Sequence, residues 1–260
     1  MTGWLAILAF GFFLGMRHAT DADHVLAVTT IVARHRAVRD AAMVGVFWGV
    51  GHTLTILTVG SGIVLFGWVI PPRVGLSMEL AVGAMLVLLG AITLRSVLEN
   101  VDETIASARA AGGHVHSHAH AHGEYIHTHA HGHEPEAHPH APDRTPVARL
   151  DRRFGRFGLY SAIRPIVIGM VHGLAGSAAV ALLVLTTIRE PRWSVLYLGL
   201  FGSGTIIGMM LITMAIAVPF ATTAGRFSQW NRRLRLASGA LSLGFGLFVA
   251  WRVGFVEGLF

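Results

Sequence analysis

Four ionisable side chains lie within seven residues of one another in the first apolar stretch of the sequence. They are His18, Asp21, Asp23 and His24. Ionisable groups at membrane depth are costly, so a cluster of this kind needs a compensating partner, and a bound cation is the simplest one. Imidazole and carboxylate ligands together suit the borderline divalent ions of the transition metals. The cluster therefore predicts a metal site inside a membrane.

The spacing leaves two geometries open for the aspartates. On an ideal helix, His18, Asp21 and His24 fall along one flank, whereas Asp23 points away. In that case Asp21 faces the ion and Asp23 only orients a histidine ligand. If the helix unwinds at this point, both acids face the ion.

Two further histidines lie in other apolar stretches. His52 follows Gly49 and Gly51 and is the natural additional ligand. His172 stands alone in its stretch, where a lone histidine is more often a hydrogen-bonded core residue at a helix interface, so we rank it second, together with Asp21. The predicted metal ligands are therefore His18, Asp23, His24 and His52.

Most of the other histidines gather in one polar segment. Imidazoles at every second position in this segment can chelate divalent metal in many equivalent ways. A tract so polar and repetitive cannot bury a core, and we expect a flexible cytoplasmic loop at residues 99–158. This composition is equally compatible with two roles. The segment serves in metal capture, buffering or sensing, or it is a dispensable spacer. The eleven candidate accessory ligands are His114, His116, His118, His120, His122, His127, His129, His131, His133, His138 and His140.

The composition indicates an integral membrane protein. Of the 260 residues, 53% are hydrophobic and 13% are charged, and the mean hydropathy is +0.59. Cysteine is absent, which excludes disulfides, thiolate metal sites and thiol redox chemistry. The formal charge of +6 comes from Arg in short clusters between apolar runs. Such clusters are typical of topology signals and not of a surface that binds nucleic acid.

Six apolar segments are long enough to cross a hydrocarbon layer of about 30 Å as helices. They cover residues 4–32, 41–70, 74–98, 159–188, 194–220 and 236–256. No Lys or Arg precedes Arg17, and the first run is longer than a signal-peptide core, so we expect this run to be retained as a span. We therefore predict an all-α, polytopic membrane protein of six helices.

The distribution of Arg predicts the orientation of these spans. The connections at residues 34–39, 149–156 and 226–235 are rich in Arg, whereas those at residues 71–73 and 189–192 carry fewer. Because rich and poor connections alternate, the positive-inside rule places the rich ones in the cytoplasm and both termini outside the plasma or inner membrane.

The second half of the sequence repeats the first. The matching runs are Gly15-Met16-Arg17-His18 with Gly169-Met170-Val171-His172, Trp48-Gly49-Val50-Gly51 with Phe201-Gly202-Ser203-Gly204, and Leu80-Ala81-Val82-Gly83-Ala84 with Leu236-Ala237-Ser238-Gly239-Ala240. Each half holds three predicted spans, so the copies at residues 1–98 and 159–260 must be inverted relative to each other. Transporters built in this way place the substrate site at the interface between the repeats.

Several predicted spans are longer than the about 20 residues that a crossing requires. Glycines lie inside them, before His18, before His52 and around His172. Tilt absorbs some excess length, but overlength spans with internal glycines are typical of broken transporter helices. We expect breaks in the first and fourth spans.

The run from Arg17 to His24 resembles the signature of the nickel/cobalt transporter family, H-x-x-x-x-D-H, here His18, Asp23 and His24. Gly51-His52-Thr53 is similar to the second histidine motif of that family. Six spans, a His-rich central loop and the run from Ile168 to Ala178 resemble its urease-accessory-like branch. The resemblance implies Ni2+ or Co2+ as the transported substrate, no prosthetic group, and a link to the maturation of nickel enzymes such as urease or hydrogenase. It also implies that the four predicted ligands hold the metal.

We therefore expect a secondary permease for divalent nickel or cobalt that acts in uptake, with efflux as the alternative. A phosphate-binding glycine loop is excluded because the chain has no Lys. The absence of a His-Glu-x-x-His arrangement disfavours an intramembrane metalloenzyme. A metal sensor that used the loop alone would leave the intramembrane histidines without a role. The expected partners are the divalent ion and the lipid bilayer, and no nucleic acid.

Overall fold

The computed structural model describes residues 2–33, 38–110, 116–122, 125–131, 159–173, 188, 190–223 and 228–260. Its elements, in chain order, are α1 (Thr2–His18), α2 (Ala22–Val32), α3 (Val38–Phe66), α4 (Pro72–Ala110), β1 (His116–His122), β2 (Tyr125–His131), α6 (Leu159–Gly173), α8 (Pro191–Thr223), α9 (Ser228–Trp251) and the π-helix η3 (Arg252–Val256).

Four of the described helical stretches are long and apolar enough to cross a membrane. They are Val38–Phe66, Pro72–Leu98, Pro191–Thr222 and Gln229–Val256. Three shorter apolar stretches accompany them, Leu5–His18, Ala22–Val32 and Ala162–Gly173. The prediction of a polytopic helical membrane protein is confirmed, because these helices fall on the six predicted apolar segments.

The first predicted span is broken, as its length and glycines indicated. Helix α1 ends at His18 and α2 begins at Ala22. The Thr20 hydroxyl donates a hydrogen bond to the carbonyl oxygen of Arg17 at 2.6 Å, and Asp21 adopts an extended backbone with φ −62° and ψ 148°. Polar side chains that bond to nearby backbone in this way compete with continuation of the helix.

The second predicted span, unlike the first, is continuous. Helix α3 runs without a break through 29 residues, and the glycines within it, including Gly49 and Gly51, let neighbouring helices approach closely. Helix α6 is described as far as Gly173, so the second part of the fourth predicted span lies outside the described residues.

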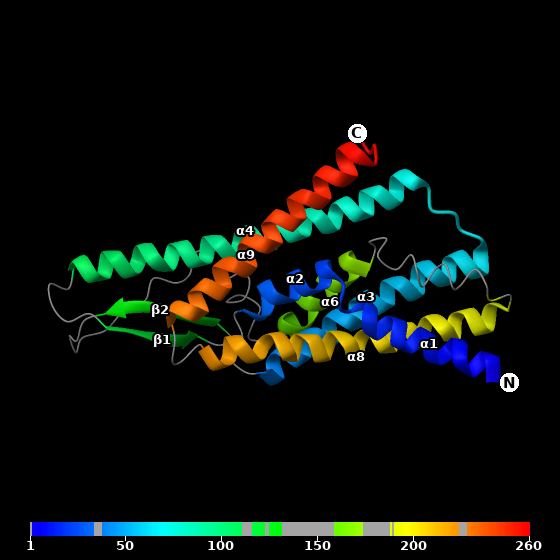
Figure 1. Cartoon of the computed structure of the whole chain (residues 1–260), viewed down its shortest axis with the longest axis horizontal. Helices are drawn as coiled ribbons and strands as arrows, with labels where there is room; N and C mark the ends of the chain where they lie inside the picture. The colour runs from blue at the N-terminus through cyan, green and yellow to red at the C-terminus, as the bar shows by residue number, and fades with distance from the viewer. Residues whose placement is uncertain are drawn as a thin grey trace.

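The helices pack in a reciprocal pattern (Figure 1). Helix α3 lies against α8, and α4 lies against α9. Helix α1 packs on α8, and α6 packs in the same way on α3. These are the contacts expected if α1, α3 and α4 of the first half correspond to α6, α8 and α9 of the second.

Glycine contacts repeat this correspondence in detail. A Cβ on Gly15 would lie 2.0 Å from the carbonyl oxygen of Phe201, and a Cβ on Gly169 would lie 2.1 Å from that of Trp48. The two contacts are equivalent in the sequence repeat, because Gly15 matches Gly169 and Phe201 matches Trp48. The same exchange relates Gly51 beside Ile166 to Gly204 beside Phe12, at 2.1 Å and 2.0 Å. Only residues without a Cβ allow backbones to approach so closely.

Two apolar cores lie along α3 and α8, on either side of one polar level. On α3, Trp48 belongs to the first core and Ile56 to the second, each one turn from His52. On α8, Met209 belongs to the first core and Phe201 to the second. The polar side chains between these cores are therefore separated from both ends of α3 and α8 by packed apolar residues.

Part of the segment predicted as a loop after residue 98 has regular secondary structure. Helix α4 continues to Ala110, and β1 pairs with β2 in an antiparallel hairpin that contacts α4. Alternation of His with small residues has the period of a β-strand, which accounts for the strands. The hairpin register pairs His116 with His131, His118 with His129 and His120 with His127. Four of the predicted loop ligands, His114, His133, His138 and His140, lie outside the described residues.

Candidate metal site

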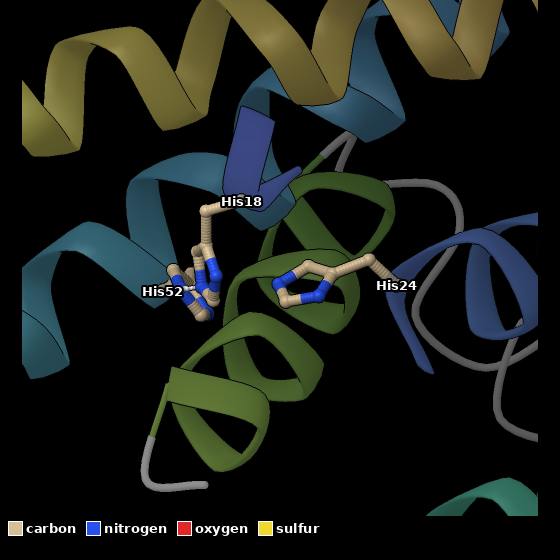
Figure 2. A group of neighbouring side chains, drawn as sticks. All are labelled: His18, His24 and His52. Carbon is tan, nitrogen blue, oxygen red and sulfur yellow. Dashed lines mark hydrogen bonds between the residues drawn. The ribbon is translucent and has the colours of Figure 1, made fainter. Parts of the chain in front are cut away.

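Four histidines converge from four helices at the level where the first span is broken, and Figure 2 draws three of them, His18, His24 and His52. His18 is the last residue of α1, His24 lies in the first turn of α2, and His52 lies within α3. His172 lies at the end of the described part of α6. Their exposed fractions are 5%, 0%, 1% and 0%. Imidazoles that are so deeply buried in a membrane protein indicate a functional site.

His18, His24 and His52 form the first of two possible ligand groups. Each can offer one nitrogen such that all three nitrogens lie within 4.8 Å of one another. Nε2 of His18 faces Nε2 of His52 at 3.0 Å. Because two nitrogen atoms at this distance point at the same place, they can bind one ion together or share one proton.

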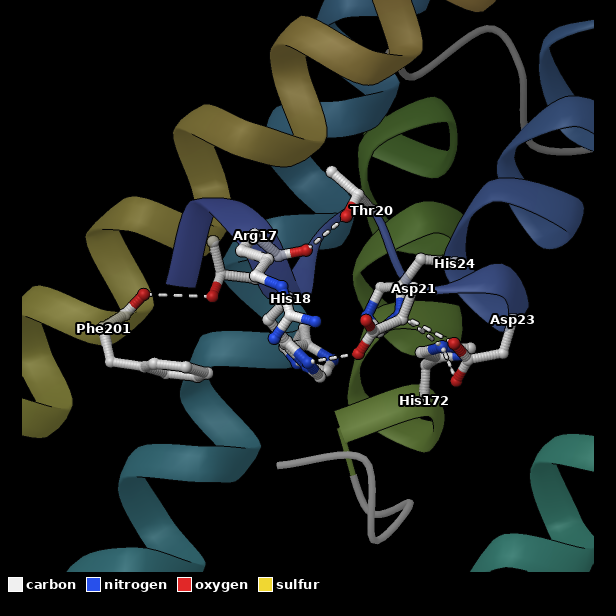
Figure 3. Close-up of polar contacts among 10 residues, drawn as sticks. Arg17, His18, Thr20, Asp21, Asp23, His24, His172 and Phe201 are labelled. Atoms are coloured by element: carbon white, nitrogen blue, oxygen red, sulfur yellow. Dashed lines mark hydrogen bonds and ion pairs between the residues drawn. The ribbon is translucent and has the colours of Figure 1, made fainter. Parts of the chain in front are cut away.

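Asp21 orients the first group without belonging to it (Figure 3). Its carboxylate oxygen Oδ2 accepts a hydrogen bond from Nδ1 of His18 at 2.9 Å. This bond fixes the proton on Nδ1 and leaves the lone pair of Nε2 free for a metal. Asp21 occupies the N-cap position of α2, but its side chain makes no capping hydrogen bond. Its carboxylate therefore serves the histidine and not the helix.

Asp23, His24 and His172 form the second group. Nε2 of His172 lies 3.1 Å from Oδ2 of Asp23 and 3.3 Å from Nδ1 of His24. The same Nδ1 lies 3.2 Å from Oδ1 of Asp23. The ligand atoms of this group also lie within 4.8 Å of one another. One carboxylate and two imidazoles are thus gathered beside the first group, with His24 common to both.

Several buried nitrogens of the cluster have no hydrogen-bond partner among the described residues. They are Nε2 of His24, Nδ1 of His52 and Nδ1 of His172. Polar atoms left unpaired in an apolar interior are destabilising, and most buried polar atoms find a partner. A cation bound between His18, His24 and His52 would satisfy Nε2 of His24. The carbonyl end of α1, which carries the negative end of the helix dipole, also favours a cation at His18.

The structure brings all the residues ranked from the sequence together. His18, Asp23, His24 and His52 lie in the two groups, and of the second-ranked residues Asp21 contacts His18 and His172 contacts Asp23. The helix is interrupted between the two acids, and each acid faces a histidine. The helix is thus unwound as in the second of the two geometries that the spacing left open, but only Asp23 lies in a ligand group, whereas Asp21 contacts His18.

Two aromatic residues that were not among the predicted site residues pack against histidines of the site. The ring of Phe201 lies 5.5 Å from that of His18, and the ring of Trp48 lies 5.6 Å from that of His172, centroid to centroid. Phe201 and Trp48 match each other in the sequence repeat, as His18 and His172 do. That repeat was the signal that could have identified both.

Comparisons with known proteins agree with this arrangement. Residues 2–145 match the family described as High-affinity nickel-transport protein. The chain is 32% identical over 256 residues to the urease accessory protein UreH of Bacillus sp. (strain TB-90), and this similarity covers 98% of the chain and 95% of the relative. No solved structure matches the chain.

Proposed function

Because the chain belongs to the family of high-affinity nickel-transport proteins, we propose that its buried histidine–aspartate cluster is the site that holds nickel during transport. Membership of this family makes the chain a membrane transporter and not an enzyme. The nickel ion is the substrate of the protein. Co2+ has similar ligand preferences, and we propose it as a second substrate.

The observation that carries the proposal is the convergence of His18, Asp23, His24, His52 and His172 at one buried level. Nothing in helix packing requires five such side chains to meet, and burying them without a ligand is costly. Imidazole and carboxylate ligands without thiolate suit a borderline divalent ion. The cluster joins side chains from the first half with His172 of the second, and the interface between repeats is where transporters of this plan bind their substrate.

The position of the cluster between two apolar cores suits a transporter in an occluded state. Packed residues one turn away on α3, Trp48 and Ile56, separate His52 from both ends of that helix. Transport then requires the two halves to move relative to each other, so that each core opens in turn. Release is favoured by protonation of the ligands, because protons and metal compete for the same lone pairs.

We also propose that nickel moves into the cell and that the His-rich segment faces the cytoplasm. The Arg-rich connections follow α2, precede α6 and join α8 to α9, and the positive-inside rule assigns them to the cytoplasmic side. The hairpin lies at the same end of the molecule as the end of α8, opposite the N-terminus (Figure 1). A supply of nickel to a urease is consistent with the name of the relative, a urease accessory protein.

Nickel accumulation in cells that express single variants tests the metal site. We expect accumulation to fall to the level of cells without the protein in His18→Ala, Asp23→Asn, His24→Ala and His52→Ala, because each removes a ligand and leaves its partners unpaired at membrane depth. Thr205→Val is the matched control, since Thr205 is equally buried and bonds only to the carbonyl oxygen of Phe201. Normal accumulation in well-inserted His18→Ala and His24→Ala variants would refute the proposal.

Orientation and direction have separate tests. The chain has no native cysteine, so single cysteines can be labelled from outside intact cells with an impermeant reagent. We expect Phe260→Cys to be labelled and Ser117→Cys to be protected. Labelling of Ser117→Cys in intact cells would contradict the proposed orientation. A lower nickel content in expressing cells than in control cells would establish efflux in place of uptake.

A further inference from the structure

We propose that the cluster provides two overlapping positions for the ion, which share His24, and that nickel passes from one to the other during transport. This inference rests on the proposed function. The first position is bounded by His18, His24 and His52, and the second by Asp23, His24 and His172. A neutral imidazole has one free lone pair, so an ion bound to one nitrogen of His24 leaves the other nitrogen protonated and excludes a second ion from the other position.

His24 is the central residue of the cluster. Its ring centroid lies 4.7 Å from that of His18, 5.0 Å from that of His52 and 4.2 Å from that of His172. The rings of His52 and His172 are farther from each other, at 6.0 Å. The two nitrogens of His24 also divide between the positions. Nδ1 faces Asp23 and His172, and Nε2 is unpartnered in the described structure while the ring is directed toward His18 and His52 (Figure 2).

Each position has its own carboxylate. Asp23 lies within the second position, and Asp21 supports the first through its hydrogen bond to His18. A hydrogen-bonded carboxylate strengthens a histidine ligand and fixes its tautomer. A divalent ion therefore meets three ligands and one negative charge in either position. This division accounts for the presence of two aspartates within three residues, each turned to a different histidine (Figure 3).

The two positions differ in which of the two repeat-related histidines, His18 or His172, they contain. His18 and His172 match in the sequence repeat, and each is packed against the matching aromatic residue of the opposite half, Phe201 and Trp48. One position contains His18 and the other contains His172. An ion that moves between them passes from a ligand of the first repeat to the corresponding ligand of the second. His24 takes part in both positions, through Nε2 in the first and Nδ1 in the second, so the ion exchanges one nitrogen of this ring for the other as it moves.

The two positions can be separated by nickel binding to the purified protein in lipid nanodiscs. Binding is measured by equilibrium dialysis with Ni2+ alone, and the ligands are identified from the X-ray absorption spectrum of the bound nickel. The variants are His52→Ala, which removes only the first position, His172→Ala, which removes only the second, His24→Ala, and the double variant of His52 and His172. Thr205→Val is the control. Glutamine replaces alanine in any variant that does not fold.

We expect the wild-type chain and each of the two position-specific variants to bind one nickel ion per chain. His24→Ala and the double variant should lose binding. The spectrum of His52→Ala should contain fewer imidazole ligands than that of His172→Ala, because its remaining position includes the carboxylate of Asp23. Loss of binding in both His52→Ala and His172→Ala, with wild-type binding intact, would show a single shared site and overturn this inference only. A wild-type chain that binds no nickel would overturn the proposed function as well.

Discussion

The two halves of the molecule share their packing but not their ligands. Glycines at matching positions admit the backbone of the opposite half at nearly the same distance, and matching aromatic residues pack on matching histidines. The first half, however, supplies His18, Asp23, His24 and His52, whereas the second supplies His172. Thr205 occupies the position that matches His52. Repetition therefore preserves the scaffold that forms the interface, and the chemistry can be concentrated in one copy.

The largest difference is expected when the matching residues His52 and Thr205 are each replaced. His52→Thr gives α3 the residue that α8 carries, and it should abolish nickel accumulation because a ligand is lost. Thr205→Val on α8 removes only a hydrogen bond within that helix, worth about 1 kcal/mol, and should leave accumulation near normal. Uptake of nickel by cells with equal amounts of each variant measures both. Equal loss of uptake in both variants would contradict the asymmetry of the halves.

The shared scaffold predicts the opposite outcome for the glycines, which should be equally sensitive in both halves. Gly15→Ala and Gly169→Ala each place a Cβ against a carbonyl oxygen, so each should destabilise the protein by about 1–3 kcal/mol or more through overpacking. Thermal unfolding in detergent, followed by loss of helical circular dichroism, measures the change. Gly199→Ala is the control, since a Cβ there meets nothing within 4 Å. A tolerant Gly169 beside a sensitive Gly15 would show that the repeat is not a packing repeat.

The segment that joins the halves should matter less than the contacts between them. Deletion of residues 113–140 removes many equivalent imidazoles but none of the contacts of α1 with α8 or of α3 with α6. We expect the maximal rate of nickel uptake to be largely retained and its dependence on nickel concentration to change. Uptake measured over a range of nickel concentrations tests this. Complete loss of uptake in a deletion variant that is present in the membrane would place the segment on the transport path.

The smallest effect is expected at a polar group that one half has and the other lacks. Tyr197 is buried in the second apolar core, and its hydroxyl has no hydrogen-bond partner among the described residues. The matching residue on α3 is Val44, which is apolar. Tyr197→Phe should therefore be neutral or raise stability by about 1 kcal/mol, since an unsatisfied buried hydroxyl is removed. A lower unfolding temperature for Tyr197→Phe would reveal a hydrogen bond that forms in another state of the transporter.

The sequence by itself determined the class of the protein, the approximate spans, the repeat and the break at the first cluster. These features follow from local properties. Apolar runs, internal glycines and a turn with two aspartates affect the conformation of the residues next to them in the sequence. The continuation of α4 to Ala110 and the hairpin at β1 and β2 were not foreseen, since a polar repetitive composition indicates only that a segment does not form a core.

The grouping of the ligands was decided only by the tertiary structure. Spacing along one helix could not choose between Asp21 and Asp23, and the fold uses both, on different histidines. Spacing also could not show that His172 contacts Asp23 and His24, although His172 and His24 are 148 residues apart in the sequence. That contact depends on how α6 packs against α3. Local patterns identify which residues are costly to bury. The close approach of helices at their glycines decides which of those residues meet, and therefore where an ion can be held.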